Sequence, residues 1–279
     1  MKTRFIIFAL PIFVVAATAS AAEEACRNVL SRVFYNQYST IEPRTRDRAV
    51  YAELCASEYP QAQQIVKRAR QSGDDGSLGL WYGLFNLDDI EPGGKGTSAL
   101  SLSEDRFRQW KAGYCSKTSE VEAYQAAGLF MQSAMTAKGG QNKGLDGWSS
   151  CMRKQEGLAC WATPGLQQSN VVLNVHWMAP SSTDAASHAQ PEVQYSFVTR
   201  GIVSKFDGAP AKRLLPDGYK LKPGTTQIPV TREADTTGTA NLKVNFGGRE
   251  HNCKVFIPGD RDFTMSEPFV NRLKIKYPG

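Results

Sequence analysis

The segment CMRKQEGLACWATPG, residues 151–165, separates two halves of the chain that differ in hydrophobic periodicity. Before it, apolar residues recur every three or four positions, which is typical of amphipathic helices. After Pro164 they recur at every second position, which is typical of strands with one buried face. The sequence therefore predicts an α+β fold. An all-α domain over residues 22–163 is followed by an antiparallel β-sandwich of immunoglobulin-like architecture over residues 164–279.

The N-terminal half contains several segments with helical periodicity. Two of them begin with a capping box, formed by Ser101 with Glu104 and by Ser119 with Glu122. In a capping box the serine hydroxyl accepts a backbone hydrogen bond while the glutamate reaches back to the serine N–H. The predicted helices cover residues 23–38, 45–58, 60–71, 101–114, 119–137 and 143–153.

The C-terminal half contains about seven short strands, as in an immunoglobulin-like sandwich. They are predicted over residues 170–178, 192–203, 219–222, 226–232, 239–246, 251–257 and 271–277. In the first strand Asn174 and His176 fall on the face opposite the apolar residues, and in the second strand Val193, Tyr195 and Phe197 are expected to lie together. Only one cysteine lies in this half, so the Cys-Trp-Cys pattern of true immunoglobulin domains is absent.

The N-terminus has the features of a secretory signal peptide over residues 1–21. Lys2 and Arg4 precede an apolar run over residues 5–15, and small residues follow it. That run is shorter than the roughly 18 residues of a membrane span. We therefore expect export to the periplasm or the extracellular medium, with no transmembrane segment in the mature chain.

The six cysteines predict three disulfides, because exported proteins fold in an oxidising environment. Five of them precede Pro164 and one follows it, so complete pairing requires at least one bridge across that proline. One pairing is favoured among the 15 that six cysteines allow. It joins Cys26 to Cys55, Cys115 to Cys151, and Cys160 to Cys253.

Positive charge is concentrated in the C-terminal half. Residues 22–163 contain 17 basic and 17 acidic residues, whereas residues 164–279 contain 14 basic and 10 acidic residues. If two of the predicted strands are neighbours, five cations share one surface: Lys220, Lys222, Arg272, Lys274 and Lys276. Such a surface suits an anionic glycan or the cell envelope. Alternatively, charges on outer or edge strands prevent unwanted strand pairing. The excess is too small to indicate nucleic acid.

No catalytic motif is present. The chain has three histidines and lacks the Gly-x-Ser-x-Gly, His-Glu-x-x-His and dinucleotide-binding patterns. His176 is a candidate ligand-binding residue, with a solvated strand face as the alternative. His251 and Cys253 share a strand face, but a cysteine in an oxidised chain is expected to form a disulfide. We predict no metal, no cofactor and no catalytic residue.

Three functions are compatible with this sequence. The first is a non-enzymatic binding or interaction protein of the cell envelope or secretome, which should show a clustered basic or aromatic surface. The second is an exported hydrolase, which should bring His176 or paired carboxylates together in a cleft between the domains. The third is a membrane-active, toxin-like protein that uses the apolar segment 78–90 and exposes Trp81, Tyr82 and Phe85. Burial of that segment in the core is the alternative to a membrane role.

Overall fold

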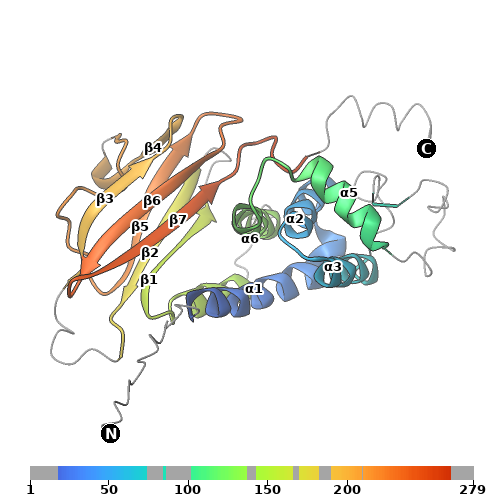
Figure 1. Cartoon of the computed structure of the whole chain (residues 1–279), viewed down its shortest axis with the longest axis horizontal. Helices are drawn as coiled ribbons and strands as arrows, with labels where there is room; N and C mark the ends of the chain where they lie inside the picture. Colours follow the sequence, from blue (N-terminus) through green and yellow to red (C-terminus); the bar gives the residue numbers. More distant parts are fainter. Residues whose placement is uncertain are drawn as a thin grey trace, which may run out of the picture.

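The computed structural model describes residues 18–73, 84–85, 102–136, 143–165, 170–181, 190–208 and 210–264. Helices form the N-terminal part, and two antiparallel sheets form the C-terminal part (Figure 1). The predicted α+β layout is confirmed. No helix within these ranges is both long enough and apolar enough to cross a membrane.

The helical part is built around α6, the most central helix. This helix packs on α1 and α2 on one side and on strands β1 and β7 on the other. Its small buried residues, Ala123, Ala126 and Ala127, allow that close packing. The helices are α1 (Thr18–Gln37), α2 (Pro43–Cys55), α3 (Tyr59–Gln71), α5 (Glu104–Tyr114), α6 (Glu120–Thr136) and α7 (Lys143–Met152).

One of the two predicted capping boxes is present. Ahead of α6, the Ser119 N–H donates to Glu122 Oε2 over 3.1 Å, and the Glu122 N–H donates to Ser119 Oγ over 3.3 Å. The box assigned to Ser101 is wrong. Helix α5 begins at Glu104, which puts Ser103 at the N-cap, where its hydroxyl accepts from the Arg106 N–H. A capping box needs the glutamate at the third helical position, which is Arg106 here, whereas Glu104 occupies the first.

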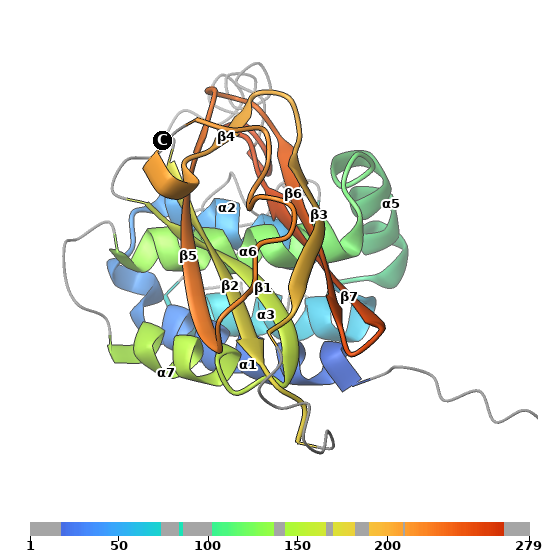
Figure 2. The same cartoon turned by 90° about the vertical axis from the view of Figure 1, so that its left-hand side faces the viewer.

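Within the described part of the chain, seven strands form two sheets whose inner faces share one apolar core. All their pairings are antiparallel, with strand orders β1-β2-β5-β4 and β3-β6-β7. Figure 2 shows the two sheets facing each other. The strands are β1 (Gly157–Pro164), β2 (Asn170–Met178), β3 (Glu192–Val198), β4 (Ile202–Ser204), β5 (Gly224–Arg232), β6 (Gly238–Phe246) and β7 (Arg249–Ile257).

Strand β1 was not predicted, because it begins at Gly157, ahead of the change in periodicity. Ala159 and Trp161 pack into the helical core, whereas Leu158, Cys160 and Ala162 pack against the core between the sheets. A strand covered on both faces carries apolar residues without alternation. The segment GLACWAT therefore lacks the period-two pattern that identifies the other strands.

Two further strand predictions are wrong. The predicted strand 192–203 is interrupted by a turn at Gly201, whose φ is +80°, and it divides into β3 and β4, which belong to different sheets. The predicted strand 219–222 contributes only an isolated bridge between Glu192 and Lys220. The predicted strand 271–277 lies outside the described residues.

The prediction for Tyr195 is also wrong. Val193 is buried as expected, but Tyr195 is 53% exposed. The pairing register with β6 shifts between these two residues, which leaves Gln194 as the extra residue of a β-bulge. A bulge reverses the alternation of the residues that follow it. Tyr195 therefore lies on the face opposite Val193.

The three predicted disulfides are present, but only one pairing was correct. Cys160–Cys253 is confirmed, and it is the bridge that crosses Pro164. The other two bridges are Cys26–Cys151 and Cys55–Cys115. Helix α1 packs on α7, and Cys55 at the end of α2 meets Cys115 at the end of α5. Helices that follow each other in sequence are therefore not the ones that are bridged. Three disulfides fit an oxidising compartment outside the cytoplasm.

Candidate functional site

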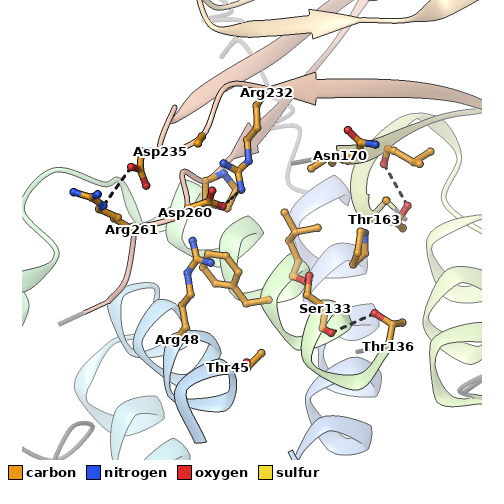
Figure 3. Close-up of a pocket in the computed structure, with 18 of the residues that line it drawn as sticks. Thr45, Arg48, Ser133, Thr136, Thr163, Asn170, Arg232, Asp235, Asp260 and Arg261 are labelled. Atoms are coloured by element: carbon orange, nitrogen blue, oxygen red, sulfur yellow. Dashed lines mark hydrogen bonds and ion pairs between the residues drawn. The ribbon is translucent and has the colours of Figure 1, made fainter. Parts of the chain in front are cut away.

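A cleft of about 1310 Å³ lies where the helices meet the sheets (Figure 3). One side is formed by α2 and α6. The other side is formed by the adjoining ends of β1, β2 and β5, the turn after β5, and the segment that follows β7. Residues far apart in the sequence thus line one space.

Arg48 fastens α2 to the segment after β7. Its guanidinium donates to the carbonyl oxygens of Gly259 and Asp262, the latter over 2.8 Å. The same group lies 4.0 Å above the ring of Phe130, on α6. Burial lowers the pKa of Arg48 to about 10, an effect opposed by Asp260 and Asp262. The guanidinium remains charged at neutral pH, and its main role is to hold the two parts of the chain together.

Arg232, at the end of β5, points into the same space from the side of the sheets (Figure 3). It forms an ion pair with Asp260, and its side chain is only 5% exposed. The hydrogen bond from Arg232 lowers the pKa of Asp260 below its usual value, although partial burial acts in the opposite direction. Asp260 is therefore ionised at neutral pH and is unsuited to act as a proton donor there.

The remaining two arginines of the cleft are more accessible. Arg261 pairs with Asp235 over 3.2 Å, and its side chain is 86% exposed. Arg44 is exposed, and no ion pair holds it to a carboxylate among the residues that the structure describes. Among the described residues that line the cleft, four arginines thus face two aspartates, an excess of two positive charges.

Polar but uncharged groups border the cleft along the outer face of the first sheet. Asn174 Nδ2 donates to Thr163 Oγ1 over 3.2 Å, and Gln227 Nε2 donates to Asn174 Oδ1 over 3.2 Å. Thr163 and Gln227 line the cleft, as does Ser133 on α6. The cleft therefore combines cations with hydroxyl and amide groups above the apolar ring of Phe130.

His176 lies on the same face of β2 as Asn174, as predicted, but it is buried and does not line the cleft. His176 is 6% exposed and Asn174 is 3% exposed, so this strand face is buried and the alternative of a solvated face is wrong. The ring of Trp161 lies 6.3 Å from the ring of His176. His176 Nδ1 is 2.9 Å from Thr225 Oγ1, and burial lowers the pKa of its imidazole.

The predicted basic residues are distant from the cleft. Lys220 and Lys222 are exposed, and Lys220 bridges to Glu192 at the start of β3. Glu192 pairs with Asn245, next to the β6–β7 turn, whereas the cleft lies beyond the opposite end of that hairpin. Arg272, Lys274 and Lys276 lie outside the described residues. A shared surface of all five cations stays a prediction.

The described lining of the cleft contains no histidine and no cysteine. Its two aspartates are paired with arginines rather than with each other. Across the described ranges, no group of three or more His, Cys, Asp or Glu residues could hold a metal ion.

The arginines of the cleft were missed by sequence reasoning. They come from α2, β5 and the segment after β7, and each follows ordinary loop or helix residues. No local pattern distinguishes them from other surface cations. Only the docking of the helices on the sheets brings them together.

The segment 78–90 is described only at Leu84 and Phe85, and both side chains are buried, at 0% and 6% exposure. This agrees with a core role for these two residues and contradicts the exposure of Phe85 that a membrane-active protein requires. Trp81 and Tyr82 lie outside the described residues.

No protein-family model matches this chain, and comparison with curated proteins and with solved structures found no match.

Proposed function

We propose that this chain is an exported, non-enzymatic binding protein that holds an acidic oligosaccharide in the cleft between its helices and its sheets. The observation that carries the proposal is the convergence of four arginines, contributed by both parts of the chain, on one cleft. Because two of them are balanced by aspartates, the net attraction is for anions.

The size and lining of the cleft support an extended ligand. A volume of about 1310 Å³ exceeds the roughly 300–1,000 Å³ of typical small-molecule sites. Hydroxyl and amide groups such as those of Thr163, Asn170 and Gln227 match the hydroxyl groups of a saccharide. Arg44 and Arg261 are accessible and can meet its carboxylates or sulfates.

The proposal includes the predicted signal peptide over residues 1–21. The three disulfides support an oxidising location, because such bridges persist mainly outside the cytoplasm. Identification of the N-terminus of the mature protein by mass spectrometry tests this part. A mature chain that still carries residues 1–21 contradicts it.

We also propose an immunoglobulin-like architecture for the sheets. Lettered in chain order, the strands follow the orders A-B-E-D and C-F-G of a constant-type domain. The bridge Cys160–Cys253 differs from the immunoglobulin pattern because it joins the first and last strands. The likeness concerns architecture and supplies no function.

The test is calorimetric titration of the mature protein with a galacturonate hexasaccharide and with its methyl ester, which lacks the charges. The acidic form should bind more tightly, and added salt should weaken its binding. Arg44→Glu combined with Arg261→Glu should reduce its affinity by about tenfold or more, because each change replaces attraction by repulsion.

The matched control reverses two exposed cations outside the cleft, Lys220→Glu with Lys222→Glu. It should leave the affinity close to that of the wild type. If this control abolishes binding while the cleft variant does not, the basic strand surface carries the function and the cleft does not. Equal binding of the acid and its ester contradicts charge recognition altogether.

A further inference from the structure

A second candidate site lies on the outer face of sheet β3-β6-β7, whose strand β7 contacts α6 through Lys254 (Figures 1 and 2). Tyr195 is 53% exposed there, and the ring of the partly buried Phe197 lies 5.4 Å from it at an interplanar angle of 48°. We refer to the surface formed by Tyr195, Phe197, Lys243, Asn241 and Asn252 as the aromatic platform. It is independent of the cleft.

The bulge at Gln194 creates the aromatic platform. Without it, Gln194 would oppose Lys243 on the outer face, and Tyr195 would point into the core with Val193. The bulge instead places Tyr195 opposite Lys243 and Phe197 opposite Asn241. Bulges commonly re-aim side chains at functional sites. Exposing Tyr195, and part of Phe197, gives up core stabilisation that full burial of these rings would bring.

Polar groups continue the platform across the sheet. Lys243 pairs with Asn252 of β7, and Asn241 pairs with Lys254. Three strands at about 4.8 Å spacing make each of these rows about 10 Å wide. The platform thus offers two rings followed by amide groups over the length of about two sugar rings.

The charges of this face are compensated. Lys243 Nζ lies 2.6 Å from Glu250 Oε1, and Lys254 Nζ lies 2.9 Å from Glu122 Oε1. A face without net charge offers no long-range attraction to anions or to an anionic membrane. Its occupant should therefore be neutral.

The backbone edge of β3 is already occupied. The Val193 N–H donates to the Tyr219 carbonyl over 2.9 Å, and the Val198 N–H donates to the Lys212 carbonyl over 3.0 Å. An extended peptide therefore cannot add as a further strand there, which is a common mode of peptide binding. This leaves recognition by rings and amides from the outer face.

We propose that the aromatic platform binds a neutral glycan. The axial C–H groups of a pyranose pack on an aromatic face, and its hydroxyl groups exchange hydrogen bonds with amides. Tyr195 supplies the accessible ring with a polar hydroxyl at its tip. Asn241 and Asn252 supply the amides, and both lie on strands held by the sheet.

The test titrates the mature protein with three uncharged hexasaccharides, of β-1,4-glucose, β-1,4-N-acetylglucosamine and α-1,4-glucose, followed by NMR and calorimetry. At least one should bind at millimolar concentration or below. Tyr195→Ser should weaken that binding by about tenfold, whereas Tyr195→Phe should largely retain it. Because Tyr195 is exposed, its replacement should leave the folded state intact.

The matched control is Tyr114→Ser, which removes an aromatic side chain of similar exposure, 48%, from the end of α5. It should leave binding unchanged, as should the cleft variant with Arg44→Glu and Arg261→Glu. The proposal is overturned if none of the three sugars binds, or if Tyr195→Ser binds as well as the wild type. It is also overturned if Tyr114→Ser weakens binding equally, since that indicates non-specific aromatic contact. The cleft variant changes only acidic-sugar binding and Tyr195→Ser only neutral-sugar binding, so either proposal can fail without the other.

Discussion

The cleft and the aromatic platform differ in how they are built. The cleft takes its arginines from α2, β5 and the segment after β7, so it exists only while the helices are docked on the sheets. The aromatic platform comes from three neighbouring strands and needs only the sheet. The cleft is cationic, whereas the charges of the platform are compensated. A variant that weakens the docking of the helices on the sheets should therefore impair binding in the cleft more than binding on the aromatic platform.

The largest expected effect comes from removing the bridge Cys160–Cys253 with two Cys→Ser changes. Closing a loop of 93 residues is worth about 4 to 5 kcal/mol in the chain-entropy description of the unfolded state. The free energy of unfolding, measured in urea, should fall by about that amount. Both sites depend on these sheets, so both should lose thermal stability.

The corresponding control removes Cys55–Cys115, which closes a loop of 60 residues among the helices. The expected loss is similar, about 4 kcal/mol. Its local effect should nevertheless be stronger on the cleft than on the platform, because the cleft needs α2. Loss of neutral-sugar binding at a temperature where acidic-sugar binding persists would contradict this assignment.

A smaller effect is expected for Arg48→Met. The change removes two hydrogen bonds from a charged donor to Gly259 and Asp262, each worth about 1.5 kcal/mol or more. Stability should fall by about 3 kcal/mol, and acidic-sugar binding should weaken while neutral-sugar binding is retained. Urea denaturation and titration of both sugars measure the separation.

Arg44→Met is the matched control for Arg48→Met, because it removes an exposed arginine of the same helix that is not paired with a carboxylate among the described residues. It should change stability little. Equal losses of stability in the two variants would show that Arg48 does not hold the two parts together.

The smallest expected effect concerns the pair of Arg232 and Asp260. The pKa of Asp260 is lower in the folded protein than in the unfolded chain, chiefly through its hydrogen bond from Arg232. The pair therefore stabilises the fold above about pH 4 and loses this contribution as the pH falls below it. Asp260→Asn should cost about 1 kcal/mol at pH 7, and its melting temperature should approach that of the wild type near pH 3. A difference that stays constant over this range would contradict the assignment.

The features predicted from sequence were those with a strong local signal. The hairpin of β6 and β7 follows from clean alternation over residues 239–246 and the Gly247-Gly248 turn, and both glycines have the positive φ that such a turn requires. The helix after Ser119 follows from its capping box. In each case a few neighbouring residues determine the local conformation.

The features missed depend on packing between distant segments. Strand β1 shows no alternation because both of its faces are buried, and the bulge at Gln194 has no sequence signal. The arginines of the cleft meet only through the docking of the helices on the sheets. The same is true of Cys26 and Cys151, which are brought together by the packing of α1 on α7.

The bridge between the first and the last strand also has a mechanical consequence. Tension along the backbone passes from Cys160 to Cys253 through the sulfur atoms and does not load the residues between them. About 300 Å of extensible chain, at roughly 3.3 Å per residue, is thereby withheld from the stretching force. The bridge Cys26–Cys151 does the same for most of the helices, so a chain anchored at both ends carries the load mainly on the residues outside these two loops.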